Sequence, residues 1–167
     1  QATGDKKGNR WYDLSWIVAG QSEAAVREKV ERSLEDLPDA VGMNNHRGSL
    51  STTDGALMEP FMKALGEKQL GFLDSRTIRG SVAYKTALRS GIPAAYNSVF
   101  IDHYNNAKFM KEQLARLVSL AKHHGWAVGI CHIRSETLKM LAQLDVSQFK
   151  EVRFITIPEL FSCLGRP

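Results

Sequence analysis

Short apolar runs alternate with amphipathic stretches along most of the chain, and this alternation predicts its secondary structure. Most of the runs are continuous, which is typical of strands buried on both faces. The stretches between them repeat apolar residues every three or four positions, as one face of a helix does. Strands are predicted at residues 11–18, 40–44, 70–73, 93–101, 126–131 and 152–156. Helices are predicted at residues 22–37, 57–65, 81–90, 105–124, 135–144 and 158–164.

The ends of these helices follow from residues that favour caps. Serines precede three of them and are predicted N-caps, namely Ser22, Ser81 and Ser135. Glycines are predicted to close three helices, namely Gly66, Gly91 and Gly125. Pro60 is tolerable only in the first turn of its helix, because proline has no backbone N–H to donate.

Strand and helix alternate about six times, which predicts an α/β fold with a parallel sheet or a closed barrel. The chain has 167 residues, 43% of them hydrophobic and 24% charged, as in ordinary folded proteins. No internal repeat, low-complexity tract or linker interrupts it. We therefore expect one domain spanning residues 1–167.

Charge and cysteine content narrow the possible functions. The net charge is +4, but basic and acidic residues are interspersed. The sequence has no stripe of Lys and Arg interleaved with aromatic residues, so it gives no sign of nucleic-acid binding. The two cysteines, Cys131 and Cys163, form no CxxC pair, so a cysteine-based zinc site is excluded, while a disulfide stays open.

Targeting signals are also missing from the sequence. No apolar run reaches the roughly 18 residues of a membrane span, and no signal peptide is present. Because the chain does not begin with Met, Gln1 is expected to be an internal residue of a mature, trimmed or longer protein.

Polar side chains gather where the predicted strands end. The groups are Asn44, Asn45 and His46 after the second strand, Asp74 and Arg76 after the third, Asp102 and His103 after the fourth, and His132 after the fifth. Active sites of parallel α/β proteins are built on the carboxyl ends of the strands. We therefore expect these side chains to surround one pocket.

Each candidate also has a purely structural interpretation. His46 could cap its loop, and Asp74 could form a structural ion pair with Arg76. Asp102 could be the N-cap of the long helix that follows it, and His132 could be a hydrogen-bonded core histidine. Trp11 points away from the apolar side of its strand, which makes it a candidate for substrate contact.

Common catalytic motifs are absent, which leaves chemistry based on His and Asp. The sequence contains no GxGxxG, GxxxxGK[ST], GxSxG or HExxH motif. Two histidines and a carboxylate can hold Zn²⁺ with an open position for water. The residues therefore favour divalent metal binding combined with general acid–base catalysis.

Four segments resemble the divergent polysaccharide deacetylase family, which is related to the NodB-type carbohydrate esterases. Residues 41–49 (VGMNNHRGS) resemble its GxNNHxGS signature, and residues 72–77 (FLDSRT) match its FLDSRT segment. Residues 99–102 are similar to its VFLD strand, and residues 128–132 to its late AIGHP strand. The resemblance runs from about Asp39 to the C-terminus.

The resemblance implies a distorted (β/α) barrel and metal-dependent removal of N- or O-acetyl groups from a polysaccharide, with zinc as the expected metal. Carried over by position, His46 is the metal ligand and His132 is the acid or a further ligand. Asp74 and Arg76 orient the base, the ligands or the substrate. The expected substrate contacts are Asn44, Asn45, Ser49 and Asp102. Trp11, which precedes the matching segments, is a further expected contact because of its place on the predicted strand. A periplasmic or extracellular location is also implied.

The sequence departs from the family pattern at three places. The family's opening Asp-Asp strand has no counterpart, so we expect a barrel without its N-terminal strands. Asn97-Ser98 replaces an Arg-Asp pair, and Cys131 and Ile133 replace the Gly and Pro around the late histidine. Two alternatives to the deacetylase hypothesis stay open: a non-catalytic carbohydrate-binding module, and an unrelated α/β hydrolase or lyase acting on a small molecule.

Overall fold

The computed structural model describes residues 16–46 and 50–165, which fall into two compact units. One unit comprises the described residues up to Ala95 together with the segment from Pro158, and the other runs from Tyr96 to Ile157. Strand β3 (Ala94–Phe100) passes from the first unit into the second. The expected single domain spanning the whole chain stays a prediction.

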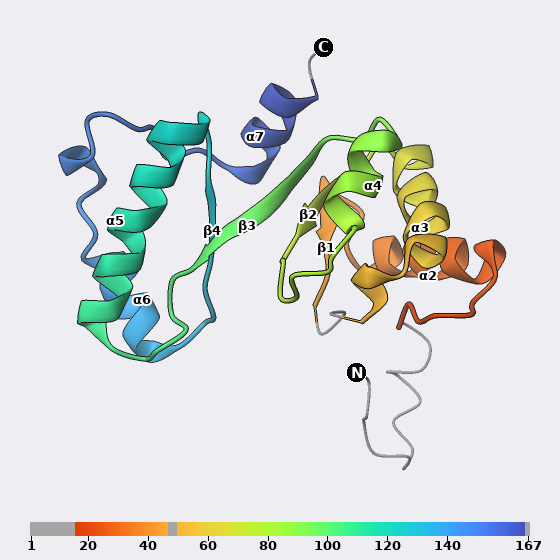
Figure 1. The fold of residues 1–167 in the computed structure, drawn as a ribbon, viewed down its shortest axis with the longest axis horizontal. Coiled ribbons are helices and arrows are strands. Elements are labelled where there is room, and N and C mark those ends of the chain that lie inside the picture. Colours follow the sequence, from red (N-terminus) through yellow and green to blue (C-terminus); the bar gives the residue numbers. More distant parts are fainter. Residues whose placement is uncertain (1–15, 47–49, 166–167) are drawn as a thin grey trace. The chain divides into compact units, whose positions relative to one another are not determined.

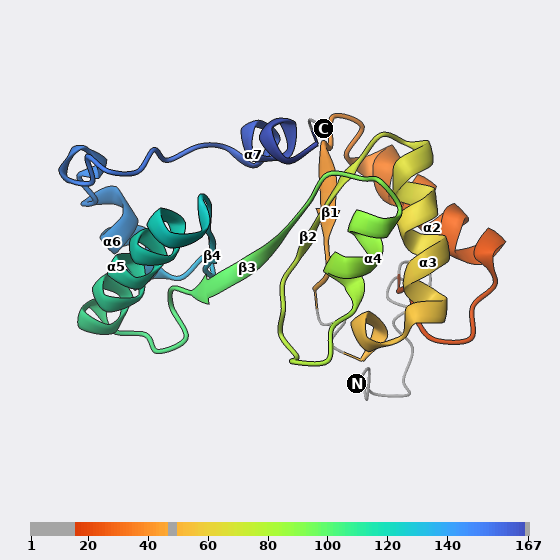
Figure 2. The ribbon, with the colours of Figure 1, turned by 45° about the horizontal axis from the view of Figure 1, so that its top comes forward.

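The first unit is built around two parallel strands. Its elements are α2 (Glu23–Asp36), β1 (Gly42–Asn44), α3 (Gly55–Glu67), β2 (Gly71–Asp74), α4 (Ala83–Arg89) and α7 (Ile157–Leu164), with a 3₁₀ turn at Ser51–Thr53. β1 pairs with β2 so that Gly42 lies opposite Gly71. Helices α2, α3 and α4 lie on one side of this pair and α7 on the other (Figure 1 and Figure 2).

Aromatic rings from different helices cover the two faces of this pair. Phe72 is fully buried and meets Phe61 of α3 edge-on, with ring centroids 5.8 Å apart. On the opposite face the ring of Phe161, from α7, lies directly on Gly71 and Gly42. A Cβ at either glycine would come within 2.7 Å of that ring. The two glycines therefore allow α7 to approach the strands closely.

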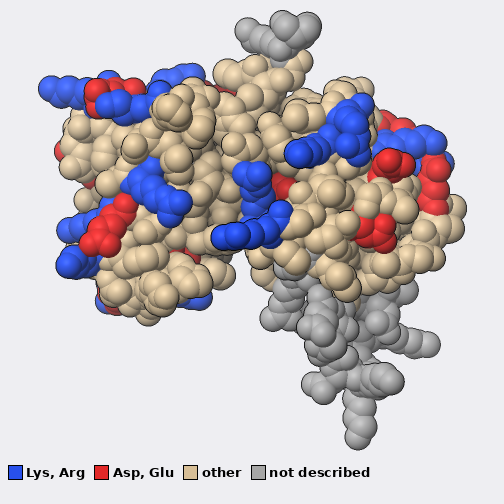
Figure 3. Space-filling view, in the orientation of Figure 1, with Lys and Arg blue, Asp and Glu red and all other residues tan. Residues whose placement is uncertain are grey.

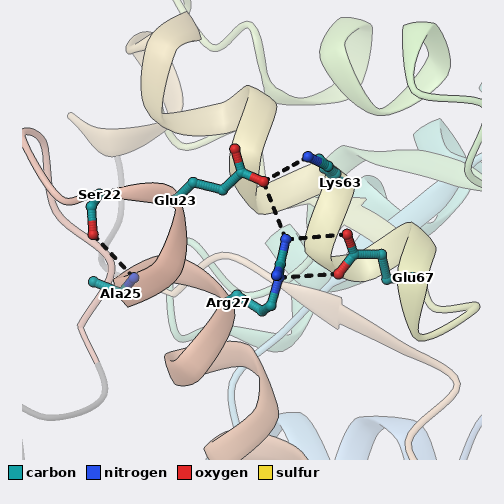
Figure 4. Close-up of polar contacts among 6 residues, drawn as sticks. All are labelled: Ser22, Glu23, Ala25, Arg27, Lys63 and Glu67. Carbon is teal, nitrogen blue, oxygen red and sulfur yellow. Dashed lines mark hydrogen bonds and ion pairs between the residues drawn. The ribbon is translucent and has the colours of Figure 1, made fainter.

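Helices α2 and α3 are joined by side chains at the surface (Figure 4). The hydroxyl of Ser22 accepts a hydrogen bond from Ala25 N and caps α2, as expected. Arg27 bonds both Glu23 on its own helix and Glu67 on α3, and Lys63 also reaches Glu23. These pairs are exposed, so packing of the buried residues between the helices stabilises the contact more than the charges do.

The second unit also contains a parallel pair of strands. β3 pairs with β4 (Val128–Ile130), and the register shifts between Asn97 and Val99. The other elements are α5 (Ala107–His124), α6 (Ser135–Ala142) and a 3₁₀ turn at Val146–Gln148. A small core of Val99, Ile101, Met110 and Met140 holds them together. No helix among the described residues is long and apolar enough to cross a membrane.

The parallel α/β class predicted from the sequence is confirmed, but two predicted strands are wrong where they are described. Residues 152–156 form no strand and are mostly exposed, so they lack the burial on both faces that the prediction assumed. Residues 16–18 are also not strand, and the rest of that predicted segment lies outside the described residues. The four inner strands are confirmed with small changes of boundary.

Several predicted helix ends are wrong because the caps come from other residues. α3 begins at Gly55, after an Asp54 cap, so Pro60 is its sixth residue and not in the first turn. Gly66 lies inside α3, which ends at Glu67, and Gln69 just beyond it is in the left-handed conformation, at φ 57°. The bonds Leu70 N to Leu65 O and Gln69 N to Gly66 O complete this C-terminal motif.

The N-termini of the later helices differ in the same way. Val82 and Arg134 occupy the N-cap positions of α4 and α6, in place of the predicted serines at 81 and 135. Asn106 caps α5 and accepts a hydrogen bond from Phe109 N at 2.7 Å. The capping role considered for Asp102 is therefore wrong. The closing glycines Gly91 and Gly125 are confirmed, both with positive φ.

Candidate functional site

The second unit places a buried carboxylate against an exposed imidazole. Asp102 follows β3 and is wholly buried, whereas the side chain of His132, which follows β4, is 54% exposed. Oδ1 of Asp102 lies 2.9 Å from Nδ1 of His132. Oδ2 accepts hydrogen bonds from His132 N at 2.8 Å and from Thr137 Oγ1 at 3.0 Å. The carboxylate thus has a defined donor at each oxygen.

These donors keep Asp102 ionised. Burial by itself raises the pKa of a carboxyl group. The hydrogen bonds from the ring and backbone of His132 and from Thr137 outweigh burial and hold the pKa of Asp102 below its usual value. An ionised carboxylate can only accept hydrogen bonds. Nδ1 of His132 must therefore carry the hydrogen between the two groups.

The consequence is that Nε2 of His132 is the nitrogen left for chemistry. In the neutral imidazole Nε2 holds a lone pair, and in the imidazolium it holds a proton that can be given away. An imidazole whose orientation is fixed by a carboxylate is a common arrangement for general acid–base catalysis. Arg134 supports the same turn by donating from Nη1 to the carbonyl oxygen of Asp102 at 2.9 Å.

In the first unit, hydrogen bonds of Ser75 connect the ends of β1 and β2. The Ser75 hydroxyl donates to the carbonyl oxygen of Asn45 at 2.7 Å, and Ser75 N donates to Oδ1 of Asn45 at 2.8 Å. Asn44 Nδ2 donates to the same hydroxyl at 3.2 Å. Asn44 and Asn45, expected as substrate contacts, are therefore first of all the residues that fix the two strand ends together.

Asp74 holds the turn between β2 and α4. It is 1% exposed, and its Oδ1 accepts a hydrogen bond from Arg76 N at 2.9 Å. Its Oδ2 accepts from the Ser81 hydroxyl at 2.7 Å and from Tyr84 N, near the start of α4, at 3.3 Å. Arg76 is an exposed residue held at φ 48°, a strained value for a residue other than glycine. Asp74 thus fixes the backbone conformation of Arg76.

The remaining candidates are His46, Trp11 and Ser49. His46 is exposed just after β1, in the first unit. Trp11 and Ser49 lie outside the described residues. The structure forms two separate groups of predicted site residues. Asn44 and Asn45 lie beside the turn that Asp74 holds, and Asp102 contacts His132. The convergence of His46, Asp74 and His132 on one rim stays a prediction.

The described residues do not by themselves make a metal site. Within residues 16–46 and 50–165, no three His, Cys, Asp or Glu side chains are grouped so that they could hold a metal ion. His46 is the ligand that the sequence offers in the first unit. We therefore assign no chemical step to a metal.

Three residues near the site were not anticipated from the sequence. Ser75 could have been noticed as a hydroxyl directly after the end of β2. Thr137 could have been noticed as a hydroxyl in the first turn of α6. Tyr104 is 59% exposed in the loop after Asp102, and its ring meets Phe109 edge-on at 4.9 Å between centroids. An exposed aromatic ring beside a strand end offers a surface on which a sugar ring can stack.

Basic and acidic side chains are interspersed at the surface, as the sequence indicates. On the face drawn in Figure 3, Lys and Arg are spread out, and several lie beside Asp or Glu.

Comparisons with known proteins identify the family. The family described as divergent polysaccharide deacetylase matches residues 3–161. An uncharacterized protein of Haemophilus influenzae is 41% identical over 122 residues, which are 73% of this chain and 44% of that protein. The uncharacterized protein YibQ of Escherichia coli K12 is 35% identical over 146 residues, which are 87% of this chain and 45% of that protein. The chain thus spans less than half the length of these relatives.

A solved structure supports the fold independently of close sequence similarity. The crystal structure of an uncharacterized protein of Agrobacterium tumefaciens C58 matches with a TM-score of 0.72 at 21% identity. The match covers 76% of this chain and 52% of that one. The α/β fold expected from the sequence resemblance is therefore confirmed, and the chain belongs to the divergent polysaccharide deacetylase family.

Proposed function

We propose that the protein removes acetyl groups from a polysaccharide by hydrolysis, with His132 as general acid. The observation that carries this proposal is the Asp102–His132 pair: a buried, ionised carboxylate that orients an exposed imidazole. Family membership supports a glycan as the substrate. A carbohydrate deacetylase needs a proton donor for the departing sugar nitrogen or oxygen, and the imidazolium of His132 supplies one.

The reaction is balanced through Nε2 of His132. Water adds to the acetyl carbonyl carbon, the bond from that carbon to the sugar nitrogen or oxygen breaks, and acetic acid is released, which loses its proton to solvent and becomes acetate. Protonated Nε2 gives its proton to the leaving sugar group. The proton lost by the attacking water restores the imidazolium. Asp102 stays ionised throughout, because its role is to hold Nδ1–H and to stabilise the positive ring.

The first unit is proposed to bind the substrate. Asp74 fixes the backbone of Arg76, an exposed residue whose guanidinium is a donor suited to sugar hydroxyl and carbonyl oxygens. Asn44 and Asn45, tied to Ser75, shape the neighbouring strand ends. Ser49 stays a proposed substrate contact on the family resemblance. Trp11 stays one because it is an aromatic residue that points away from the apolar side of the predicted strand at residues 11–18.

A divalent metal, zinc in the first instance, is also proposed, with His46 as one ligand. Its support is the family resemblance around residues 41–49 and the exposed position of His46 after β1. A periplasmic or extracellular location is also proposed, on the family resemblance. Fractionation of cells that express the full-length protein would check the location.

The experiment that tests the function is acetate release by the full-length protein. Acetylated chitooligosaccharide and peptidoglycan are the substrates, with wild type, His132→Ala and His124→Ala compared. His124 is an exposed histidine at the end of α5 and serves as the matched control. We expect His132→Ala to lower kcat by about 10²–10⁴-fold and His124→Ala to leave it unchanged. No acetate from wild type, or equal rates for all three proteins, would overturn the proposal.

A second candidate, a non-catalytic glycan-binding module, is favoured by Asn97 and Ser98. These residues replace a charged pair of the family and serve the backbone instead. Asn97 Oδ1 accepts from Val99 N at 3.2 Å, and the Ser98 hydroxyl accepts from Val128 N at 3.3 Å. Binding of the chitooligosaccharide without acetate release, and without an effect of His132→Ala, would favour this function.

A further inference from the structure

The hydroxyl of Thr137 is fully buried and donates to the carboxylate that orients His132. Thr137 is the third residue of α6 and is 0% exposed. Its Oγ1 lies 3.0 Å from Oδ2 of Asp102, on the oxygen that does not face the imidazole ring. A buried hydroxyl aimed at a buried carboxylate can control the rotation of that carboxylate.

We propose that Thr137 is a positioning residue of the Asp102–His132 pair. Its hydroxyl fixes the rotation of the Asp102 carboxylate at which Oδ1 accepts from Nδ1 of His132, and so it keeps the hydrogen of the neutral ring on Nδ1. Nε2 is then the free nitrogen in every molecule. This inference rests on the proposed function only for what Nε2 does afterwards.

The argument depends on how the donors are shared between the two oxygens. Rotation of the carboxylate is resisted at Oδ2 by Thr137 and by His132 N, which donate at 3.0 and 2.8 Å. Without the hydroxyl, both remaining donors belong to His132, so the carboxylate can turn together with the ring. A neutral histidine whose ring nitrogens are not held by a partner exchanges between its two tautomers.

The charged groups nearby do not replace the hydroxyl. Arg134 Nη1 donates to the backbone carbonyl of Asp102 at 2.9 Å and lies 4.0 Å from Oδ2, beyond hydrogen-bond distance. Glu136, also on α6, is paired with Lys139 at 2.8 Å. Burial and the charge of Asp102 raise the pKa of the Cys131 thiol, so that group stays neutral at pH 7.

The tautomer of His132 tests this proposal. It is measured from the ¹⁵N chemical shifts of the ring nitrogens in the whole chain, at a pH where the ring is neutral. A His132→Ala sample assigns the signals. Thr137→Ser keeps the hydroxyl, and Thr137→Val keeps the shape without it. We expect wild type and Thr137→Ser to show the Nδ1–H form alone, and Thr137→Val to show both forms. A single Nδ1–H form in folded Thr137→Val would overturn the proposal.

A second comparison covers the case in which Thr137→Val does not fold. Thr137→Ser and Thr137→Ala both lack the methyl group and differ only in the hydroxyl. If these two proteins give the same tautomer, the proposal is wrong, and if only Thr137→Ala mixes the tautomers, it holds. No substrate is needed, so absence of acetate release would overturn the proposed function and leave this result standing.

Discussion

At the scale of single residues, the state of Asp102 is decided by a competition between burial and hydrogen bonding. Burial disfavours the charge, but the donors of His132 and Thr137 favour it more strongly, and the pKa ends below its ordinary value of 3.8. The sequence places Asp102 and His132 at successive strand ends. It cannot show that one is fully buried and the other exposed, because that depends on how α6 packs over the strand ends.

The lowered pKa makes Asp102 a source of pH-dependent stability. A carboxyl group with a pKa lower in the folded than in the unfolded state contributes stability fully above its unfolded pKa. This contribution is lost as the pH falls through the folded pKa. We therefore expect the free energy of unfolding to fall more steeply below pH 3.8 for wild type than for Asp102→Asn. Denaturant unfolding at a series of pH values measures it, and two parallel curves would contradict the assignment.

At the scale of elements, the contact between α7 and the β1–β2 pair depends on two glycines. A Cβ at Gly71 would lie 2.5 Å from two ring carbons of Phe161, which is too close for any real contact. Gly71→Ala should therefore lower the free energy of unfolding by about 1–3 kcal/mol. Gly55→Ala is the matched control, because its new Cβ would meet nothing within 4 Å.

A double variant separates this clash from other effects of the new methyl group. Phe161→Leu removes the ring that the methyl group would strike, so Gly71→Ala should cost less in that background. Denaturant unfolding of the four proteins gives the coupling free energy. Equal costs of Gly71→Ala in both backgrounds would show that the ring is not the obstacle.

Element ends were harder to predict than the elements themselves. The Ser22 cap was predictable because its hydroxyl bonds a nearby N–H of its own helix. α4 differs, because the carboxylate of Asp74, which belongs to a strand, takes the Ser81 hydroxyl and Tyr84 N. The end of α3 at Glu67 differs from the predicted end because Gln69, a residue other than glycine, occupies the left-handed position after it.

At the scale of the whole molecule, the proposed divalent metal predicts a defined metal content. We expect the full-length protein to bind about one divalent ion per chain, and His46→Ala to lower that content. Elemental analysis before and after treatment with a chelator measures this, together with acetate release. Activity that survives complete metal removal would contradict the metal proposal. The role of His132 would still be tested by acetate release from His132→Ala.

The sequence by itself determined the α/β class, the four inner strands and the positions of the polar groups at their ends. It did so because apolar periodicity and strand-end chemistry are local properties of the chain. The tertiary structure alone decided that residues 152–156 do not form a strand. It also decided that Phe161 covers the glycine pair, and that Asp102 is buried beneath His132 with Thr137 as its donor. These outcomes depend on contacts between segments far apart in the sequence, and such contacts leave no local pattern.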